Sequence, residues 1–264
     1  MNPADYRGIK ITRKGRLLTL CLDRPEQLNA VEGMLHEELS KVFSDAAADP
    51  QSDVILLTGS GRAFSSGGDI PWMQRMIDDP ALFDKVRVEA KRIVFSILEC
   101  EKPIIAKLNG HATGLGATLA LFCDVIFAST EAKIGDPHVA VGLVAGDGGA
   151  VIWPQLVGYA RAKEFLMTGE LLTAARAAEI GLINHAVPPS ELDARVDEFA
   201  TRLLGGATQA IRWTKATVNI GLRQLAHAVM DASLNFEALS SRTADHQEAV
   251  AAFREKRRPK FGGR

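Results

Sequence analysis

Residues 109–124 (NGHATGLGATLALFCD) have the composition of a loop that can stabilise an anion. They follow a short apolar run and open into small, helix-favouring residues. Gly110, Gly114 and Gly116 crowd the junction, and glycine is used where the backbone turns tightly or approaches a ligand closely. The pattern predicts a strand, a tight loop and a helix N-terminus, whose free N–H groups can bind an anion or a developing oxyanion.

A second loop, residues 59–70 (GSGRAFSSGGDI), repeats this design. Asp69 has the residue type of a helix N-cap, and Pro71 fits the first turn of the helix that follows. The runs before the two loops, residues 53–59 and 103–108, are too uniformly apolar to alternate, which is typical of buried parallel strands. We therefore expect the two loops to lie side by side at the carboxyl ends of neighbouring strands, where ligands bind in open α/β sheets.

The remaining pattern alternates strands with helices up to about residue 188. Further strands are predicted at residues 17–22, 124–129 and 182–187, with a short one at 132–135. Helices are predicted at residues 27–47, 86–98 and 150–157, and after residue 189 the chain is expected to be nearly all helix, with one face marked by Leu225, Val229, Phe236 and Leu239. These elements predict an α/β core domain (1–188) and a C-terminal helical region (189–264).

The composition of the chain disfavours some classes of binding partner. The chain has 264 residues, is 47% hydrophobic and carries a formal net charge of −1, which does not favour nucleic acid or an anionic membrane. It contains neither an apolar segment of signal-peptide length at its N-terminus nor a membrane-spanning run, so a cytoplasmic protein is expected. The three cysteines, Cys21, Cys100 and Cys123, are far apart and are expected to be buried thiols.

Metal and dinucleotide sites are not predicted. The six histidines show no metal-binding helical spacing. Gly114 and Gly116 begin a dinucleotide fingerprint, but Leu119 stands at its third glycine position, so this pattern fails.

Several segments together resemble a known family over nearly the whole chain. The segments are RPEQLNAV (24–31), AFSSGGDI (63–70), NGHATGLGATLALFCD (109–124), IGDPHVAVGL (134–143) and FREKRRPKF (253–261). They are similar to the crotonase superfamily, the enoyl-CoA hydratases and isomerases. The resemblance implies a spiral of ββα units and an acyl-CoA substrate, with no cofactor besides the coenzyme A that the substrate carries. It also implies a homotrimer, or a dimer of trimers, built through the C-terminal helices.

The resemblance further implies an oxyanion hole made of two backbone N–H groups, which fall on Gly68 and Leu115. Such a pair would stabilise the enolate formed from a thioester carbonyl. The loss of one donor of this kind typically costs about 3–4 kcal/mol of transition-state stabilisation. The small neighbours Gly67 and Gly116 would let the thioester oxygen approach.

The residues that match the general acid and base of the hydratases differ from the hydratase pattern. The two glutamates of the hydratases match Thr118 and His138 here, so hydration by the usual pair is not predicted. His138 is a candidate acid or base, because an imidazole titrates near neutral pH, or it lines the pocket without moving protons. Asp147 is a second candidate or only a helix N-cap; related enzymes carry a functional aspartate one position earlier, at Gly146. Asp136 is expected to orient His138 or to close a turn.

Substrate contacts are also assigned by the resemblance. Arg24 and the segment near Ala30 would contact the nucleotide of CoA, the backbone of Ser66 and Ile70 would read the adenine, and Lys256 would reach the phosphates. A solvated basic tail is the alternative for the charges around Lys256. The full set of predicted binding residues is Arg24, Ala30, Ser66, Ile70, His111, Thr118 and Lys256, with His111 expected to shape the acyl pocket.

Together these features predict an acyl-CoA enzyme that isomerises an enoyl thioester or hydrates it in a non-standard way. Hydrolysis or C–C cleavage of a cyclic or branched acyl-CoA is an alternative. A third possibility is a catalytically silent acyl-CoA-binding or RNA-binding member of the family, although the balanced net charge does not favour RNA.

Overall fold

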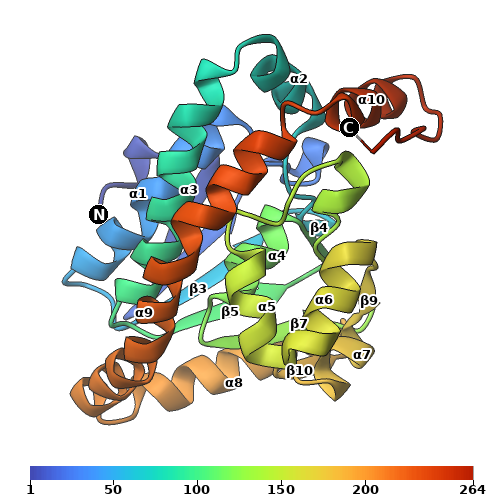
Figure 1. Ribbon diagram of the computed structural model, residues 1–264. Coiled ribbons are helices and arrows are strands. Elements are labelled where there is room, and N and C mark those ends of the chain that lie inside the picture. Colours follow the sequence, from blue (N-terminus) through green and yellow to red (C-terminus); the bar gives the residue numbers. More distant parts are fainter. Residues whose placement is uncertain (264) are drawn as a thin grey trace.

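The computed structural model describes residues 1–263 and contains two sheets packed against helices (Figure 1). The larger sheet has six strands in the order β1-β2-β3-β5-β7-β10. Only β1 and β2 are antiparallel; the other neighbours are parallel. The strands are β1 (Ile9–Lys14), β2 (Leu17–Leu22), β3 (Val54–Gly59), β5 (Ile104–Leu108), β7 (Val125–Ser129) and β10 (His185–Val187). The buried strands that the sequence predicts are present, whereas β1 was not predicted.

The smaller sheet was not recognised as a separate sheet in the residue pattern. It has the order β4-β6-β8-β9, with bounds β4 (Ala63–Ser65), β6 (His111–Thr113), β8 (Lys133–Gly135) and β9 (Leu172–Thr173). Both β4 and β6 lie inside segments interpreted as loops, because three residues are too few to show a periodicity. A strand of each sheet and then a helix follow one another along the chain, which confirms the spiral of ββα units.

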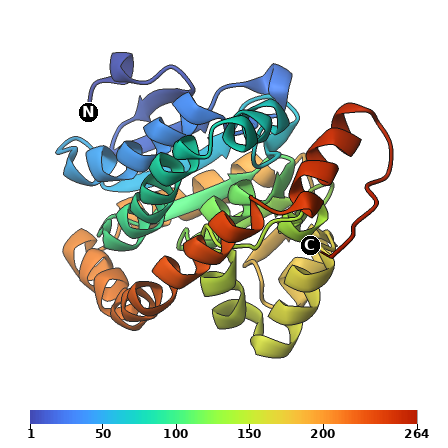
Figure 2. The ribbon, with the colours of Figure 1, turned by 45° about the horizontal axis from the view of Figure 1, so that its top comes forward.

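The helices pack on both sides of the larger sheet (Figures 1 and 2). One predicted boundary is wrong: the helix expected from residue 27 begins at Gly33, because Leu28 and Asn29 adopt positive φ and the Glu32 carboxylate caps the helix at the amides of Met34 and Leu35. The elements are η1 (Pro3–Asp5), η2 (Pro25–Gln27), α1 (Gly33–Ala48), α2 (Ile70–Asp78), α3 (Ala81–Glu99), α4 (Leu115–Leu121), η3 (His138–Val141), α5 (Gly149–Val157), α6 (Tyr159–Thr168), α7 (Ala174–Glu179), α8 (Leu192–Leu204), α9 (Thr208–Ser240) and α10 (Ala244–Arg254).

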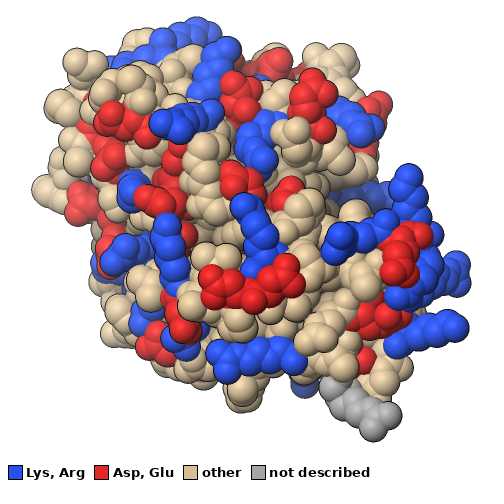
Figure 3. Space-filling view, turned by 90° about the horizontal axis from the view of Figure 1, so that it is seen from above, with Lys and Arg blue, Asp and Glu red and all other residues tan. Residues whose placement is uncertain are grey.

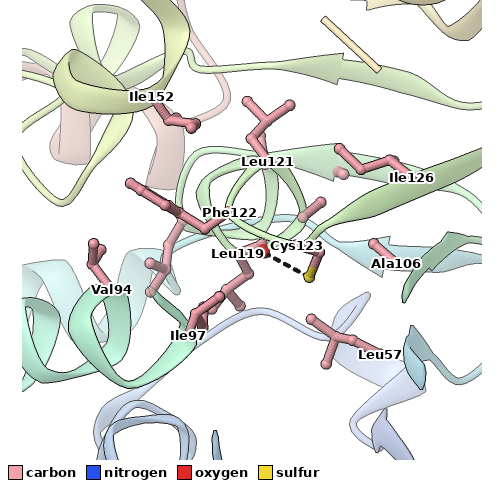
Figure 4. Packing of buried hydrophobic residues seen from close by; sticks show 14 of the residues in the cluster. Leu57, Val94, Ile97, Ala106, Leu119, Leu121, Phe122, Cys123, Ile126 and Ile152 are labelled. Carbon is pink, nitrogen blue, oxygen red and sulfur yellow. Dashed lines mark hydrogen bonds between the residues drawn. The ribbon is translucent and has the colours of Figure 1, made fainter. Parts of the chain in front are cut away.

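The short helix α4 is embedded in the hydrophobic core. All its residues are buried. In Figure 4 its side chains lie among Leu57 of β3, Val94 and Ile97 of α3 and Ile152 of α5. Because close-packed interiors leave little room for movement, the N-terminus of α4 has a fixed position.

The C-terminal helices α9 and α10 pack against helices of the preceding part of the chain. The long helix α9 contacts α3 and α5, and α10 contacts α2 and η3. After residue 189 the described chain forms helices only, as the sequence predicts. Helices α9 and α10 therefore flank the ends of the glycine-rich loops.

In the view of Figure 3, acidic and basic side chains are interspersed over the surface. The basic side chains, drawn in blue, are denser at one edge. No helix among residues 1–263 combines the length and hydropathy that a membrane crossing requires.

We expect Leu119→Ala to destabilise the protein, because Leu119 is fully buried on α4 and its truncation leaves a cavity. Chemical unfolding should show a loss of about 2–5 kcal/mol. The control Val88→Ala, at a position that is 50% exposed, should change stability by less than about 0.5 kcal/mol. Equal effects of the two substitutions would contradict the central packing role of α4.

Candidate active site

The two glycine-rich loops contact one another directly, as the sequence predicts. Gly67 has a φ of +81°, and a Cβ there would lie 2.6 Å from the Thr113 carbonyl oxygen. A Cβ at Gly116 would lie 2.7 Å from the Cβ of Ser65. Side chains at either glycine would force the loops apart, so both positions need glycine.

The backbone around Gly68 is held by a bridge to Val31. The Val31 N–H donates to the Gly67 carbonyl at 2.7 Å, and the Asp69 N–H donates to the Val31 carbonyl at 2.9 Å. Successive peptide groups of an extended segment point in opposite directions, so the Gly68 N–H points away from Val31. Gly68 lines the adjoining cavities.

Leu115 is the first residue of α4, and its N–H belongs to the unpaired first turn of a helix. The preceding residue, Gly114, has a φ of 56° and offers no capping side chain. Leu115 lines the same inner cavity as Gly68. Gly68 and Leu115, which come from the two loops, thus line one cavity.

The site consists of two adjoining cavities. The outer cavity has a volume of about 540 Å³, and its wall includes Ala30, Arg62, Ser66, Ile70 and Phe253. The inner cavity is much narrower, at about 50 Å³, and its wall includes His36, Leu115, Asp147, Leu234 and Glu237. Gly68, Met73 and His138 line both cavities, so they form the passage from one to the other.

His138 lies between two carboxylates. Its Nδ1 is hydrogen-bonded to Oδ1 of Asp136, and its Nε2 lies 3.5 Å from Oδ2 of Asp147. The Thr118 hydroxyl donates to Oδ1 of Asp147 at 3.2 Å. All four residues are buried. Thr118 therefore orients a carboxyl group that comes from another loop.

The protonation of this group follows from burial and charge. Burial lowers the pKa of His138, but the negative charges of Asp136 and Asp147 outweigh it and raise this pKa well above its ordinary value. Burial raises the pKa of Asp147, and the positive charge of His138 offsets part of that rise. His138 therefore holds its proton near neutral pH and is a proton donor or a fixed positive charge, not a free base.

Glu237 of α9 is a site residue that sequence reasoning missed. Its side chain is buried, lines the inner cavity, and leaves Oε2 without a hydrogen-bond partner among residues 1–263. Burial, followed by the negative charges of Asp147 and Asp136, raises the pKa of Glu237 to about 8. Glu237 is therefore mainly protonated at neutral pH.

The predicted face of α9 explains why Glu237 was missed. The predicted face is confirmed at Leu225 and Val229, which are partly buried and pack against the core, but Phe236 and Leu239 are 61% and 62% exposed. The fully buried positions are Ala226, Met230, Ser233, Leu234 and Glu237. A glutamate at helical spacing among small and apolar residues was the available signal, and the prediction that Phe236 faces the core hid it.

Glu237 occupies the space next to Gly146. A Cβ at position 146 would lie 2.7 Å from Oε2 of Glu237 and 2.4 Å from the Ser233 carbonyl oxygen. The resemblance places a functional carboxylate at position 146 in related enzymes. In this chain α9 brings a carboxyl group to that place instead.

Three of the predicted CoA contacts, Ala30, Ser66 and Ile70, line the outer cavity. The Arg24 guanidinium donates to the Ala30 carbonyl at 2.7 Å, so Arg24 supports this wall from behind. Lys256 is exposed and follows Phe253, which lines the cavity. Arg62, which the sequence did not single out, adds a positive charge to the wall.

The structure places His111 outside both cavities. This residue is exposed on β6, and its Nδ1 accepts a hydrogen bond from the Lys133 N–H at 3.0 Å. The side chain of its buried neighbour Ala112 points to the opposite face of the strand.

One group among the described residues could offer three metal ligands. Asp136, His138 and Asp147 place ligand atoms within 4.8 Å of one another, a grouping that the histidine spacing did not indicate. The proton that His138 holds already supplies a positive charge between the two carboxylates.

The family model for enoyl-CoA hydratase/isomerase matches residues 12–264. The chain belongs to the enoyl-CoA hydratase/isomerase family. It is 34% identical to a crotonyl-CoA hydratase of Syntrophomonas wolfei over 97% of this chain and 98% of that relative. Named relatives are hydratases and isomerases, so this chain is an enzyme of this family, a lyase or an isomerase.

Solved structures of family members share the fold. An enoyl-CoA hydratase/isomerase from Mycobacterium paratuberculosis superposes with a TM-score of 0.89 at 35% identity, covering 94% of this chain and 99% of that one. A β-diketone hydrolase from the cyanobacterium Anabaena, bound to (S)-3-oxocyclohexyl acetic acid, superposes with a TM-score of 0.84 at 29% identity, covering 90% and 96%. The family scaffold thus carries more than one reaction.

The raised pKa of Glu237 predicts a pH-dependent stability. The folded state holds this proton more tightly than the unfolded chain, so stability is greatest below the ordinary carboxyl pKa of about 4.5 and falls as the pH rises to about 8. The full effect is on the order of 5 kcal/mol. Urea unfolding between pH 5 and 8 should show this loss, and Glu237→Gln should reduce it. An equal loss in the variant would contradict the buried, protonated state of Glu237.

Proposed function

We propose that this enzyme binds an acyl-CoA thioester, stabilises its enolate at the amides of Gly68 and Leu115, and moves a proton between Asp147 and Glu237. The reaction is isomerisation of an enoyl thioester or a non-standard hydration. The observation that carries this proposal is that two carboxyl groups share the inner cavity with Gly68 and Leu115: Asp147, beside the positive charge of His138, and Glu237, whose pKa is raised to about 8.

Each group has a role that fits its environment. Asp147, held by Thr118 and beside protonated His138, is the carboxylate that removes a proton from carbon next to the thioester carbonyl. The electrons move onto the carbonyl oxygen, where two preorganised amides stabilise the negative charge. Protonated Glu237 returns a proton at another carbon, which shifts the double bond. Addition of water would use the same acid and base.

The outer cavity would hold the CoA portion. Its wall combines the backbone of Ser66 and Ile70 with the charge of Arg62, and Lys256 follows nearby. Guanidinium and ammonium groups bind phosphates well. The exposed apolar side chains of α9, Trp213, Val218, Phe236 and Leu239, support a homo-oligomer, as a trimer or a dimer of trimers.

Hydrolytic C–C cleavage is the second candidate. It is supported by the buried Asp136–His138–Asp147 group, in which an imidazole is oriented by one carboxylate and faces another, and by the likeness to the β-diketone hydrolase. In this reaction water adds to a ketone, and the departing carbon takes a proton from Glu237. The substrate would be a cyclic or branched acyl-CoA.

Mass spectrometry of products separates these reactions. Isomerisation gives a product of unchanged mass with a shifted double bond, and hydration adds one water to an enoyl-CoA. Hydrolytic C–C cleavage adds water and, for a cyclic substrate, opens the ring. A panel of enoyl-CoA, 3-oxoacyl-CoA and cyclic oxoacyl-CoA thioesters that bind without turnover would contradict the proposed function.

We expect Asp147→Asn and Glu237→Gln each to lower kcat by about 10²–10⁴-fold while CoA affinity changes little. The matched control is Asp231→Asn, which removes an exposed carboxylate from the same helix, α9. Steady-state kinetics and calorimetric titration with CoA measure the two effects. Turnover that survives both substitutions would show that the acid and base lie elsewhere.

The pH profile tests the acid separately. Glu237 donates only when protonated, so kcat should fall as the pH rises through about 8. In Glu237→Gln this decrease should be absent from the residual activity. A profile that keeps the same alkaline limb in the variant would assign that limb to another group.

A further inference from the structure

A second buried polar pair borders the inner cavity through His36, whose charge acts on Asp147. Nδ1 of His36, from α1, lies 2.7 Å from Oε2 of Glu89, from α3. The two residues are 2% and 5% exposed. His36 lines the inner cavity together with Trp72, and their rings are 5.3 Å apart. The proposed chemistry uses neither His36 nor Glu89.

The pair leaves one histidine nitrogen to meet a ligand. The second oxygen of Glu89 lies 3.4 Å from Nζ of Lys85, so both carboxylate oxygens are engaged. Glu89 fixes the ring of His36 through Nδ1. Nε2 of His36 has no hydrogen-bond partner among residues 1–263.

The surrounding wall makes this nitrogen unusual. The cavity wall includes the charged Arg87 and the apolar side chains of Met73, Met76, Phe83, Val86 and Ala90. A plain hydrocarbon chain would need only the apolar part of this wall. A buried ionisable pair costs desolvation, and well-packed apolar residues often replace such pairs without loss of stability. Packing alone therefore gives little reason for a histidine here.

We infer that His36 determines substrate specificity: its Nε2 hydrogen-bonds an oxygen on the acyl group, at a carbon beyond the thioester carbonyl. The preferred substrate is therefore a short oxo- or hydroxyacyl thioester and not an unsubstituted one. The narrow inner cavity limits the acyl group to a short chain. This inference rests on the proposed function, because it places the acyl group of a thioester in the inner cavity.

Binding measurements test the inference without requiring turnover. Isothermal titration compares hexanoyl-CoA with 4-oxo- and 5-oxohexanoyl-CoA. A buried hydrogen bond that an analogue cannot make changes affinity by about 10- to 100-fold, so at least one oxo compound should bind the wild type that much more tightly. The double variant His36→Leu/Glu89→Leu removes the pair without leaving an unpaired carboxylate and should bind all three alike. The control Ser96→Ala changes a buried polar residue of α3 that lines neither cavity and should keep the preference.

Failure of this inference is distinguishable from failure of the proposed function. Equal affinities in the wild type, or a preference that survives in the double variant, would overturn the role of His36 even if the enzyme turns these or other thioesters over. A preference that depends on His36, in a protein that turns over none of the reaction panel, would support the inference and contradict the proposed reaction. Binding of none of the three thioesters would overturn both.

Discussion

The site depends on one electrostatic constraint: a single imidazole must balance several carboxyl groups that have been removed from water. Asp136, Asp147 and Glu237 all act on His138, and burial disfavours every charge among them. His138 and Glu237 therefore each keep a proton, which limits the unpaired negative charge among these buried groups. The same arrangement that avoids unpaired charge thus supplies a carboxylate and an acid in one narrow cavity, which is the combination that proton transfer needs.

The fold holds the amides where this cavity requires them. Parallel strands β3 and β5 deliver two loops to the same edge, and β4 pairs with β6 so that the loops cannot separate. Helix α4 is fixed by its apolar surroundings, and the bridge from Val31 fixes the backbone at Gly68. The backbone at Gly68 and Leu115 is therefore set by the most buried part of the molecule, while much of the wall of the inner cavity comes from α2, α3 and α9.

The sequence predicted much of this arrangement, and its failures have physical causes. Apolar runs located β2, β3, β5 and β7, and glycines located the loops, because these signals are local. The strands β4 and β6 were too short to show a period. Glu237 entered the site through its contact with Gly146, 91 positions away in the sequence (237 − 146), which no local pattern encodes; only the buried face of α9, once known, singles it out. The exposure of His111 depended likewise on the direction of one short strand.

The contact between Gly146 and Glu237 couples two distant positions of the sequence. A side chain added at 146 alone would collide with α9, and loss of Glu237 alone would empty the place without filling it from the loop. Moving the carboxyl group from position 237 of α9 to position 146 of the loop therefore requires substitutions at both positions together. The coupling between these two positions of the chain therefore has a steric origin. Glycine at 146 leaves the room that the glutamate at 237 occupies.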